Sequence, residues 1–307
     1  MGLKLIVARL RQRETEQRML TRSTLLHLRV PFSFFLLPVY LFALSISVEY
    51  TLSDALLVFF IIHFLLYPAS NAYNSYFDRD EGSIGGLEHP PPVDRQLYGI
   101  SLLLDAAAIV LGMLVSLPFA IMLLAYGLVS KAYSHPSVRL KRYAVVSWLV
   151  AGFFQGFFTF IMVYQGVNQA SFVELTQPVV WQGAALTSLM LWGSYPMTQV
   201  YQHEEDIRRG DRTLSYRLGV RGTFHFTAAV FSLVAIAFFL YYHRWFSTVE
   251  GGLFVLFLLP VLAYFGLWYR KVAARPEYAN FRGTMRLNLI SGTCLNAFFL
   301  LSWLLHR

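Results

Sequence analysis

Long apolar stretches follow one another along most of the chain, and they restrict its fold more than any other feature. Apolar residues make up 56% of the 307-residue sequence and charged residues only 14%. Most stretches are about 18–23 residues long, enough for a helix to cross ~30 Å of hydrocarbon. Helices satisfy their own backbone hydrogen bonds in lipid, so the sequence predicts an all-α, polytopic membrane bundle. We expect nine transmembrane helices, at residues 30–48, 55–77, 96–115, 119–134, 143–163, 179–201, 223–243, 252–269 and 287–305.

Basic residues are distributed unevenly between the two ends of these predicted helices. If the N-terminus lies inside, residues 1–29 and the loops on the same side hold 23 of the 25 Lys and Arg residues, and the other side keeps only Arg244 and Arg307. Cytoplasmic loops carry an excess of Lys and Arg, so we expect a prokaryotic cytoplasmic membrane protein with its N-terminus inside. The basic residues are scattered over separate loops, which argues against nucleic-acid binding.

The same pattern divides the chain into two regions. Residues 1–29 are expected to form a basic cytoplasmic segment that lies on anionic lipid, and residues 30–307 a single transmembrane domain. The one cysteine, Cys294, excludes an intrachain disulfide and gives no metal motif. The sequence contains no glycine-rich nucleotide loop, zinc-protease motif or serine-nucleophile motif.

A phrase of 16 residues occurs twice, 128 positions apart. Residues 67–82 read YPASNAYNSYFDRDEG, and residues 195–210 read YPMTQVYQHEEDIRRG. The aligned copies share five residues, whereas unrelated windows would share about one. Both copies end long apolar stretches, where a polar face is costly and usually functional. The identical pairs are Tyr67/Tyr195, Pro68/Pro196, Tyr73/Tyr201, Asp78/Asp206 and Gly82/Gly210.

Each copy carries two amides and an Asp at spacings of three and then four. This spacing places the three side chains on one helical face. Oxygen ligands at two facing helix ends are what Mg²⁺ prefers, usually together with phosphate oxygens. Ordinary loop charges would not repeat the spacing from Pro to Asp, which favours a functional interpretation. The two sets are Asn71, Asn74 and Asp78 in the first copy, and Gln199, Gln202 and Asp206 in the second.

These motifs resemble those of the UbiA-type superfamily of membrane prenyltransferases. The segment Asn74-Ser-Tyr-Phe-Asp78-Arg-Asp80 is similar to the first Asp-rich motif of that family. Residues 202–219, with Gly210-Asp-Arg-Thr-Leu and Arg217-Leu-Gly219, are similar to the second motif and the segment that follows it. The basic stretch 133–142 resembles the loop after the fourth helix. The resemblance covers nearly the whole chain and implies an all-helical protein of typically nine spans.

The two motifs also depart from the family pattern. Ser75 stands where Asp or Asn is common, and Gly82 replaces the last Asp of the first motif. Gln199 and Gln202 occupy positions that are often Asp. An amide still offers a carbonyl oxygen to Mg²⁺, with less charge to hold the ion.

The resemblance implies a reaction and a role for each matching residue. A polyprenyl diphosphate would place its headgroup between the two motifs through Mg²⁺, and a lipophilic acceptor, expected to be aromatic, would take the prenyl group. Implied catalytic residues are Asp78, Asp206, Lys141 and Arg142. Implied metal ligands are Asn74, Asp78, Asp80, Gln202, Glu205 and Asp206. Implied contacts to the cofactor and diphosphate come from Asn71, Asn74, Arg139, Gln199, Gln202 and Arg212.

Two other interpretations stay open at the level of sequence. The departures at Gly82, Gln199 and Gln202 fit a family member that binds isoprenoid lipid without turnover. Paired broken helices also occur in small-molecule transporters. A transporter is less favoured because both phrases run in the same direction and lie near one surface, not at the midplane. Quinone-ring precursors, macrocycles and lipid alcohols all fit as acceptors, and the sequence does not indicate an oligomeric state.

Overall fold

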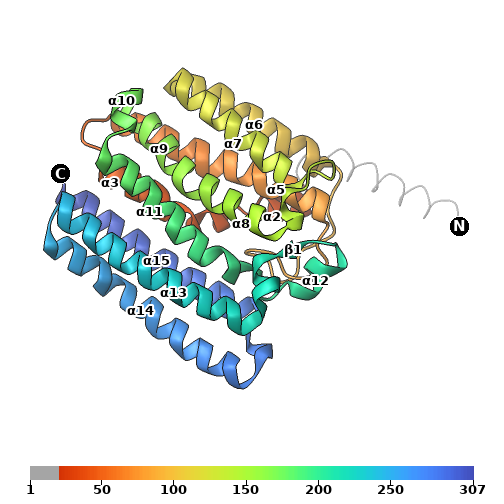
Figure 1. Cartoon of the computed structure of the whole chain (residues 1–307). Helices are drawn as coiled ribbons and strands as arrows, with labels where there is room; N and C mark the ends of the chain where they lie inside the picture. Colours follow the sequence, from red (N-terminus) through yellow and green to blue (C-terminus); the bar gives the residue numbers. More distant parts are fainter. Residues whose placement is uncertain (1–20) are drawn as a thin grey trace, which may run out of the picture.

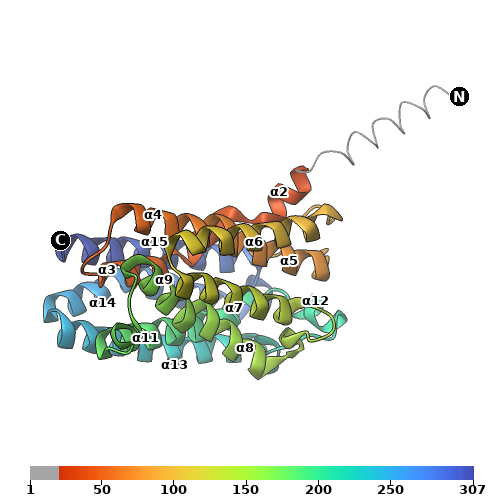
Figure 2. The ribbon, with the colours of Figure 1, turned by 90° about the horizontal axis from the view of Figure 1, so that it is seen from above.

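The computed structural model describes residues 21–307, so most of the predicted N-terminal segment lies outside the described residues. Long helices run side by side along one direction, with α12 and β1 at one end of the bundle and the C-terminus at the other (Figure 1). A view from above shows the helices stacked in layers (Figure 2). The elements are α2 (Arg22–Leu28), η1 (Val30–Phe35), α3 (Leu37–Ser45), α4 (Leu52–Phe60), η2 (Ile61–Leu66), α5 (Tyr67–Asp78), α6 (Gln96–Val115), α7 (Leu117–Ser134), η3 (Leu140–Arg142), α8 (Ala144–Gly152), η4 (Phe153–Phe158), α9 (Thr159–Asn168), α10 (Phe172–Leu175), α11 (Pro178–Ser194), η5 (Tyr195–Gln199), α12 (His203–Arg208), β1 (Arg212–Thr213), α13 (Leu214–Trp245), α14 (Thr248–Ala274), η6 (Pro276–Tyr278) and α15 (Phe281–Leu305).

The predicted all-α membrane bundle is confirmed, and each of the nine predicted spans coincides with a helical segment. Within residues 21–307, seven helices are long and apolar enough to cross a membrane, or eight if the bent pair Arg22–Phe35 and Leu37–Ser45 counts as one span. This pair bends by 43°. The remaining predicted span, 179–201, contains the 17-residue helix α11, which is shorter than the roughly 20 residues that a perpendicular crossing needs.

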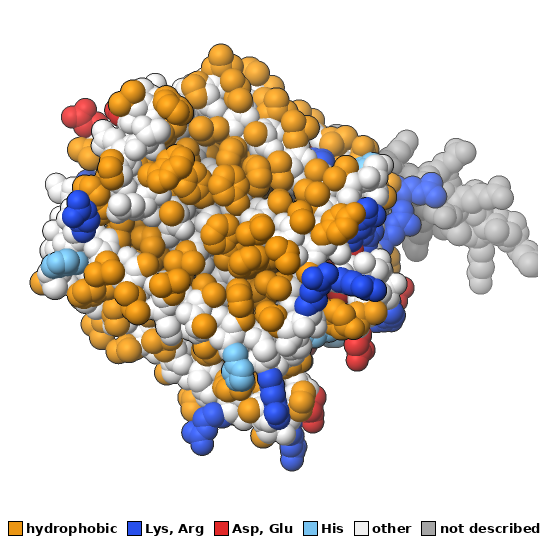
Figure 3. Space-filling view, in the orientation of Figure 1, with side chains coloured by type: hydrophobic (Ala, Val, Ile, Leu, Met, Phe, Trp, Pro, Cys, Tyr) orange, Lys and Arg blue, Asp and Glu red, His pale blue; other side chains and the backbone are white. Residues whose placement is uncertain are grey.

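Apolar side chains cover the middle of the face in Figure 3, and most of the Lys and Arg side chains visible there lie along its right and lower margins. Inside, the end of the bundle away from α12 is packed by aromatic rings. The ring of Phe42 on α3 stacks on Phe299 of α15, with centroids 4.7 Å apart, and meets Phe160 of α9 edge-on at 5.1 Å. This aromatic packing fixes the helices relative to one another. The polar residues of the two repeated phrases lie at the opposite end of the bundle.

The two copies of the repeated phrase fold differently. Before Pro68 the chain forms the π-helix η2, and the helical backbone then continues through α5 to Asp78. At Pro196 the helix instead tightens into the 3₁₀ helix η5, and α12 begins after a turn with Gln202 at its N-cap position. A proline removes one backbone donor, and the two copies accommodate this loss in different ways. The expectation of one continuous helical face in the second copy is therefore wrong.

Candidate active site

A cavity of about 270 Å³ opens at the end of the bundle that carries α12 and β1. Both copies of the repeated phrase contribute to its wall, because the carboxyl end of α5 and the segment from η5 to α12 meet there. The sequence therefore identified the principal segments of one site. The predicted residues that line the cavity are Asn71, Asn74, Asp78, Asp80, Lys141, Gln199, Gln202 and Asp206.

Lys141 is the central cation of this cavity. Its Nζ forms an ion pair with Asp78 and lies 3.7 Å from Asp211 Oδ2. Asp211 also accepts two hydrogen bonds of 2.9 Å from Arg139, in the bidentate geometry that guanidinium groups favour. Parallel backbone bridges between residues 143–144 and 212–213 hold the basic loop beside β1. Thus Arg139 does not line the cavity, but fixes the Asp211 carboxylate that faces Lys141.

A second ionic group joins the two acidic motifs. Arg209 pairs with Asp80, and also with Glu205 at 2.7 Å. Glu205 Oε1 accepts hydrogen bonds from the N–H groups of Glu81 (2.9 Å) and Gly82 (3.2 Å). Burial raises the pKa of Asp80 to about 6, and the nearby Asp78 carboxylate adds to this rise. Glu205, predicted as a metal ligand, is occupied as a clamp between the motifs and does not line the cavity.

The absence of a side chain at Gly82 has a direct geometric reason. A Cβ atom at this position would lie 2.4 Å from Glu205 Oε2. A glycine therefore allows the Glu205 carboxylate to approach the backbone closely enough to accept both hydrogen bonds. At the position where the sequence departs from the family motif, the structure therefore has a close contact between the Gly82 backbone and Glu205.

Asp206 is a carboxylate of the cavity wall with an unsatisfied buried oxygen. Its Oδ2 atom is buried and has no hydrogen-bond partner among the described residues, and the same is true of Gln199 Oε1. Burial raises the pKa of Asp206 to about 7, and repulsion from Asp211 contributes further. A buried carboxylate oxygen without a hydrogen-bond partner is costly, so this position favours a cation supplied with a ligand.

The amide side chains of the motifs present oxygen atoms to the cavity. Asn74 donates its Nδ2 to Ser134 Oγ at 3.0 Å, and Gln202 donates its Nε2 to the Ser83 carbonyl at 2.9 Å. Asn71 Nδ2 contacts the Leu28 carbonyl at 3.4 Å. Because the amino groups are engaged, the carbonyl oxygens remain as acceptors for a cation or a donor.

These oxygen donors fit Mg²⁺ on condition that a ligand completes its shell. Within residues 21–307, no group of three or more His, Cys, Asp or Glu side chains is arranged to hold a metal ion. Asp78 and Asp80 are already paired with Lys141 and Arg209. Mg²⁺ commonly uses one or two carboxylates and takes its other ligands from water and phosphate, so the unpartnered oxygen of Asp206 suits it.

Two predicted basic residues lie away from the cavity. Arg142 is exposed and places its guanidinium 4.6 Å from the centre of the Tyr143 ring. Arg212, in β1, is also exposed, and neither side chain lines the cavity. Their predicted contacts to a diphosphate have no counterpart in this geometry, because the loop turns Lys141 inward and Arg142 outward.

Arg29 is a cavity residue that the sequence analysis missed. It has a left-handed backbone (φ 48°), and its guanidinium donates to the carbonyls of Asn71 and Gly85, both at 3.3 Å. Its Nε atom is buried without a partner among the described residues. In the sequence, Arg29 is the last residue of the predicted basic N-terminal segment. Its position directly before Val30-Pro31, where the first span begins, was the available signal.

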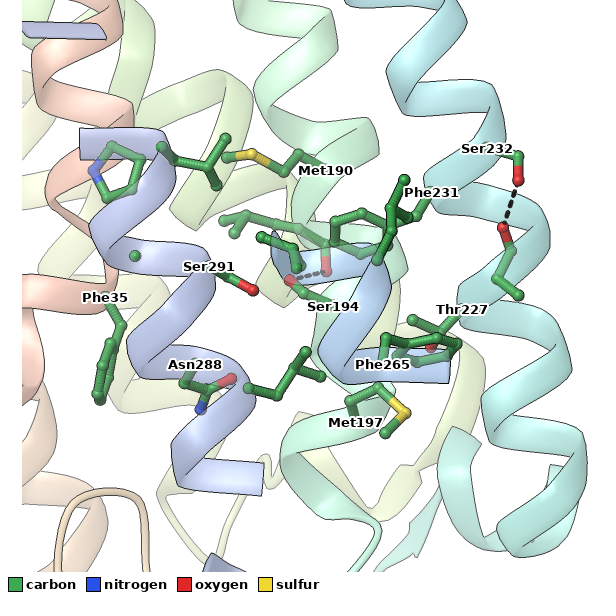
Figure 4. A pocket seen from close by; sticks show the side chains of 18 residues that line it. Phe35, Met190, Ser194, Met197, Thr227, Phe231, Ser232, Phe265, Asn288 and Ser291 are labelled. Carbon is green, nitrogen blue, oxygen red and sulfur yellow. Dashed lines mark hydrogen bonds between the residues drawn. The ribbon is translucent and has the colours of Figure 1, made fainter. Parts of the chain in front are cut away.

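Two further cavities adjoin the ionic one. Figure 4 shows an apolar cavity of about 170 Å³ between η1, α11, α13, α14 and α15. It shares Phe35, Ser194 and Asn288 with the wall of the ionic cavity. A cavity of about 230 Å³ on the other side shares Asn74 and Tyr133 with it. The site thus combines a charged centre with one apolar compartment and one cavity of mixed polar and aromatic lining.

Comparisons with known proteins agree with this architecture. The model of the UbiA prenyltransferase family matches residues 35–290. A UbiA homolog from Archaeoglobus fulgidus, solved bound to GPP and Mg²⁺, superposes with a TM-score of 0.64 at 16% identity, over 91% of this chain and 99% of that one. The apo UbiA homolog from Aeropyrum pernix K1 gives a TM-score of 0.66 at 19% identity, over 89% and 98% of the two chains.

A third solved structure, described as digeranylgeranylglyceryl phosphate synthase in membranes, gives a TM-score of 0.58 at 18% identity, over 91% of this chain and 97% of that one. No curated protein matches the chain in sequence. At these identities the solved structures establish a shared fold.

Proposed function

Because the chain belongs to the UbiA prenyltransferase family and is therefore a membrane prenyltransferase, we propose that it moves a polyprenyl group from its diphosphate to a lipophilic, aromatic acceptor in a Mg²⁺-dependent reaction. The observation that carries this proposal is the meeting of Asp78, Asp206 and Lys141 in one cavity. An apolar compartment adjoins that cavity on one side, and a second cavity lined by both polar and aromatic residues also adjoins it. The charged headgroup would occupy the ionic cavity, and the prenyl chain and acceptor the neighbouring ones.

Mg²⁺, when bound, would neutralise the charge that builds on the diphosphate as the C–O bond breaks. Asp206 is proposed as its principal protein ligand, since it lines the cavity and its buried Oδ2 atom has no hydrogen-bond partner among the described residues. The carbonyl oxygens of Gln199 and Asn74 and the carboxylates of Asp78 and Asp80 lie on the same cavity wall. Asp78 and Asp80 would contribute less negative charge to the metal, because each also forms an ion pair with Lys141 or Arg209.

Three cations of the cavity wall are proposed to hold the diphosphate. Lys141, Arg209 and Arg29 line the cavity, and Arg29 has no carboxylate partner among the described ion pairs. Fixed cations stabilise developing negative charge without reorganising during the reaction. Lys141 and Arg209 are held by Asp78 and Asp80, so their positions are set before the substrate arrives.

The aromatic part of the wall would stabilise the electron-poor allylic carbon. Tyr67, Tyr126, Tyr195 and Phe35 line the ionic cavity. Ring faces attract cations by ~0.5–2 kcal/mol each. The same rings exclude water, which would otherwise compete with the acceptor for the prenyl group.

The proposal can be tested with purified full-length protein in detergent or nanodiscs. Labelled geranyl, farnesyl and geranylgeranyl diphosphates would be supplied with a panel of hydroxylated aromatic acceptors, with Mg²⁺ or with EDTA. We expect transfer that requires Mg²⁺, and a loss of at least ~100-fold in Asp78→Ala and Asp206→Ala. Glu204→Ala is the matched control, because Glu204 is an exposed acid on the same short helix as Asp206.

Three results would contradict the proposal or change it. Wild-type activity in both Asp variants would show that the repeated phrase is structural and that the site is elsewhere. Transfer that persists in EDTA would remove the proposed role of Mg²⁺. Binding of the diphosphates without transfer to any acceptor would favour the interpretation as an isoprenoid-binding protein.

A further inference from the structure

We propose that a basic cavity between the adjoining ends of α14 and α15 binds the headgroup of an anionic phospholipid. The cavity has a volume of about 330 Å³. It lies at the end of the bundle that also carries α12 (Figure 1). None of its lining residues lines the ionic cavity or the two compartments beside it. The site is therefore separate from the proposed prenyl-transfer site and does not depend on it.

The floor of this cavity is rigid because two helices approach each other closely. A Cβ atom at Gly283 would lie 2.6 Å from the Trp268 ring, so the glycine lets α15 pack directly on that ring. Trp268 donates from Nε1 to the Tyr278 carbonyl at 2.8 Å. Tyr264 donates its hydroxyl to the Gly283 carbonyl at 3.1 Å. The helix pair therefore builds most of the cavity, and the hydrogen bond from Trp268 fixes the connection that carries Tyr278 against it.

Three cations line the cavity, and no acid does. They are Lys271 in the last turn of α14, and Arg282 and Arg286, which lie one turn apart near the start of α15. Arg282 makes an exposed ion pair with Glu88 at 2.9 Å. In the described part of the chain, Lys271 and Arg286 take part in no ion pair. Two charges converge on an open cavity without a partner from the protein.

The surroundings favour a lipid over a soluble anion. Leu267, which is 60% exposed, lies in the wall beside the cations. Tyr278, which is 43% exposed, supplies an aromatic group of the kind that is typical of the membrane–water interface. Basic pockets between transmembrane helices at this level hold anionic lipid headgroups. A zwitterionic headgroup brings its own cation, which three positive side chains would repel.

The test measures lipid binding by native mass spectrometry of the intact, full-length protein. Phosphatidylglycerol and phosphatidylcholine would be titrated separately, and phosphatidylglycerol also in the presence of excess inorganic phosphate. The variant Lys271→Gln/Arg286→Gln removes the two unpaired cations. Its control is Arg270→Gln/Arg275→Gln, which removes the same net charge from exposed neighbours that do not line the cavity.

We expect tight binding of phosphatidylglycerol and weak binding of phosphatidylcholine. The affinity for phosphatidylglycerol should fall about 25-fold in the cavity variant, at roughly fivefold for each cation, and less than about threefold in the control. Thermal unfolding would establish that both variants are folded. Equal losses in the two variants, or no loss in either, would overturn the proposal. Displacement of the lipid by inorganic phosphate would reassign the cavity to a soluble anion.

Discussion

Replacement of Asp206 by Asn is expected to stabilise the metal-free protein while it abolishes prenyl transfer. Burial raises the pKa of Asp206 from 3.8 to about 7. At about 1.4 kcal/mol per pH unit, this corresponds to a penalty of roughly 4 kcal/mol when the carboxylate is charged. Asp206 faces a cavity that water can enter, so we expect about half of this value to be observed. Asparagine keeps the shape of the side chain and removes the charge.

The pH dependence of the gain has a definite sign. Below the unfolded-state pKa the carboxyl is protonated in both states, and its ionisation does not affect stability. As the pH rises through the folded-state pKa, the wild type loses stability, because the unfolded chain releases this proton more easily. The advantage of Asp206→Asn should therefore grow between about pH 4 and pH 7, and stay constant above about pH 7.

The assay is thermal unfolding of the detergent-purified proteins in EDTA at several pH values. A gain of about 2 kcal/mol corresponds to a rise in Tm of roughly 5 °C at pH 8. Added Mg²⁺ should raise the Tm of the wild type more than that of the variant, since ligands stabilise the state that binds them. Glu204→Gln, on the same helix, should shift the Tm by less than about 1 °C. A variant that is less stable than the wild type at pH 8, or a gain that does not vary with pH, would refute the reasoning.

Three further predictions concern the charged wall and the helix packing. Lys141→Met leaves buried Asp78 without its partner and should lower the free energy of unfolding by about 3–5 kcal/mol. Arg142→Gln, at an exposed position, should lower it by less than ~0.5 kcal/mol. Similar losses in the two variants would contradict the assignment of Lys141 to the cavity and of Arg142 to the surface. Arg29→Gln should weaken diphosphate binding about tenfold in a filter or calorimetric assay, because it removes a cavity cation that forms no ion pair with a carboxylate among the described residues. Unchanged affinity would place the headgroup elsewhere. Gly156→Ala should lower the free energy of unfolding by about 1–3 kcal/mol, because its Cβ would lie 2.6 Å from the Ser188 backbone. Gly266→Ala, with open space around it in α14, should raise this free energy by up to ~1 kcal/mol. Equal effects would show that the close contact between η4 and α11 does not restrict the side chain at position 156.

The sequence by itself determined the class of fold and the main elements of the site. Apolar stretches of membrane-spanning length are a local property, so they could be located without knowledge of any contact. The repeated phrase identified Asp78 and Asp206, because a polar set that recurs at the end of an apolar stretch has few structural explanations. The sequence did not show where the α-helix ends in the second copy, because Pro196 lies in a 3₁₀ helix instead of a continuing α-helix.

Only the tertiary structure decided which charges remain available to a ligand. Glu205 and Asp206 are neighbours in sequence, yet Glu205 clamps the backbone of the first motif, while Asp206 keeps an unpartnered oxygen in the cavity. Lys141 and Arg142 are also neighbours, and one points into the cavity while the other is exposed. The strength of a charge at such a site depends on its burial and on its partners, and these come from segments far apart in the chain. Sequence patterns therefore locate the charged groups, but the three-dimensional pairing determines which of them can act.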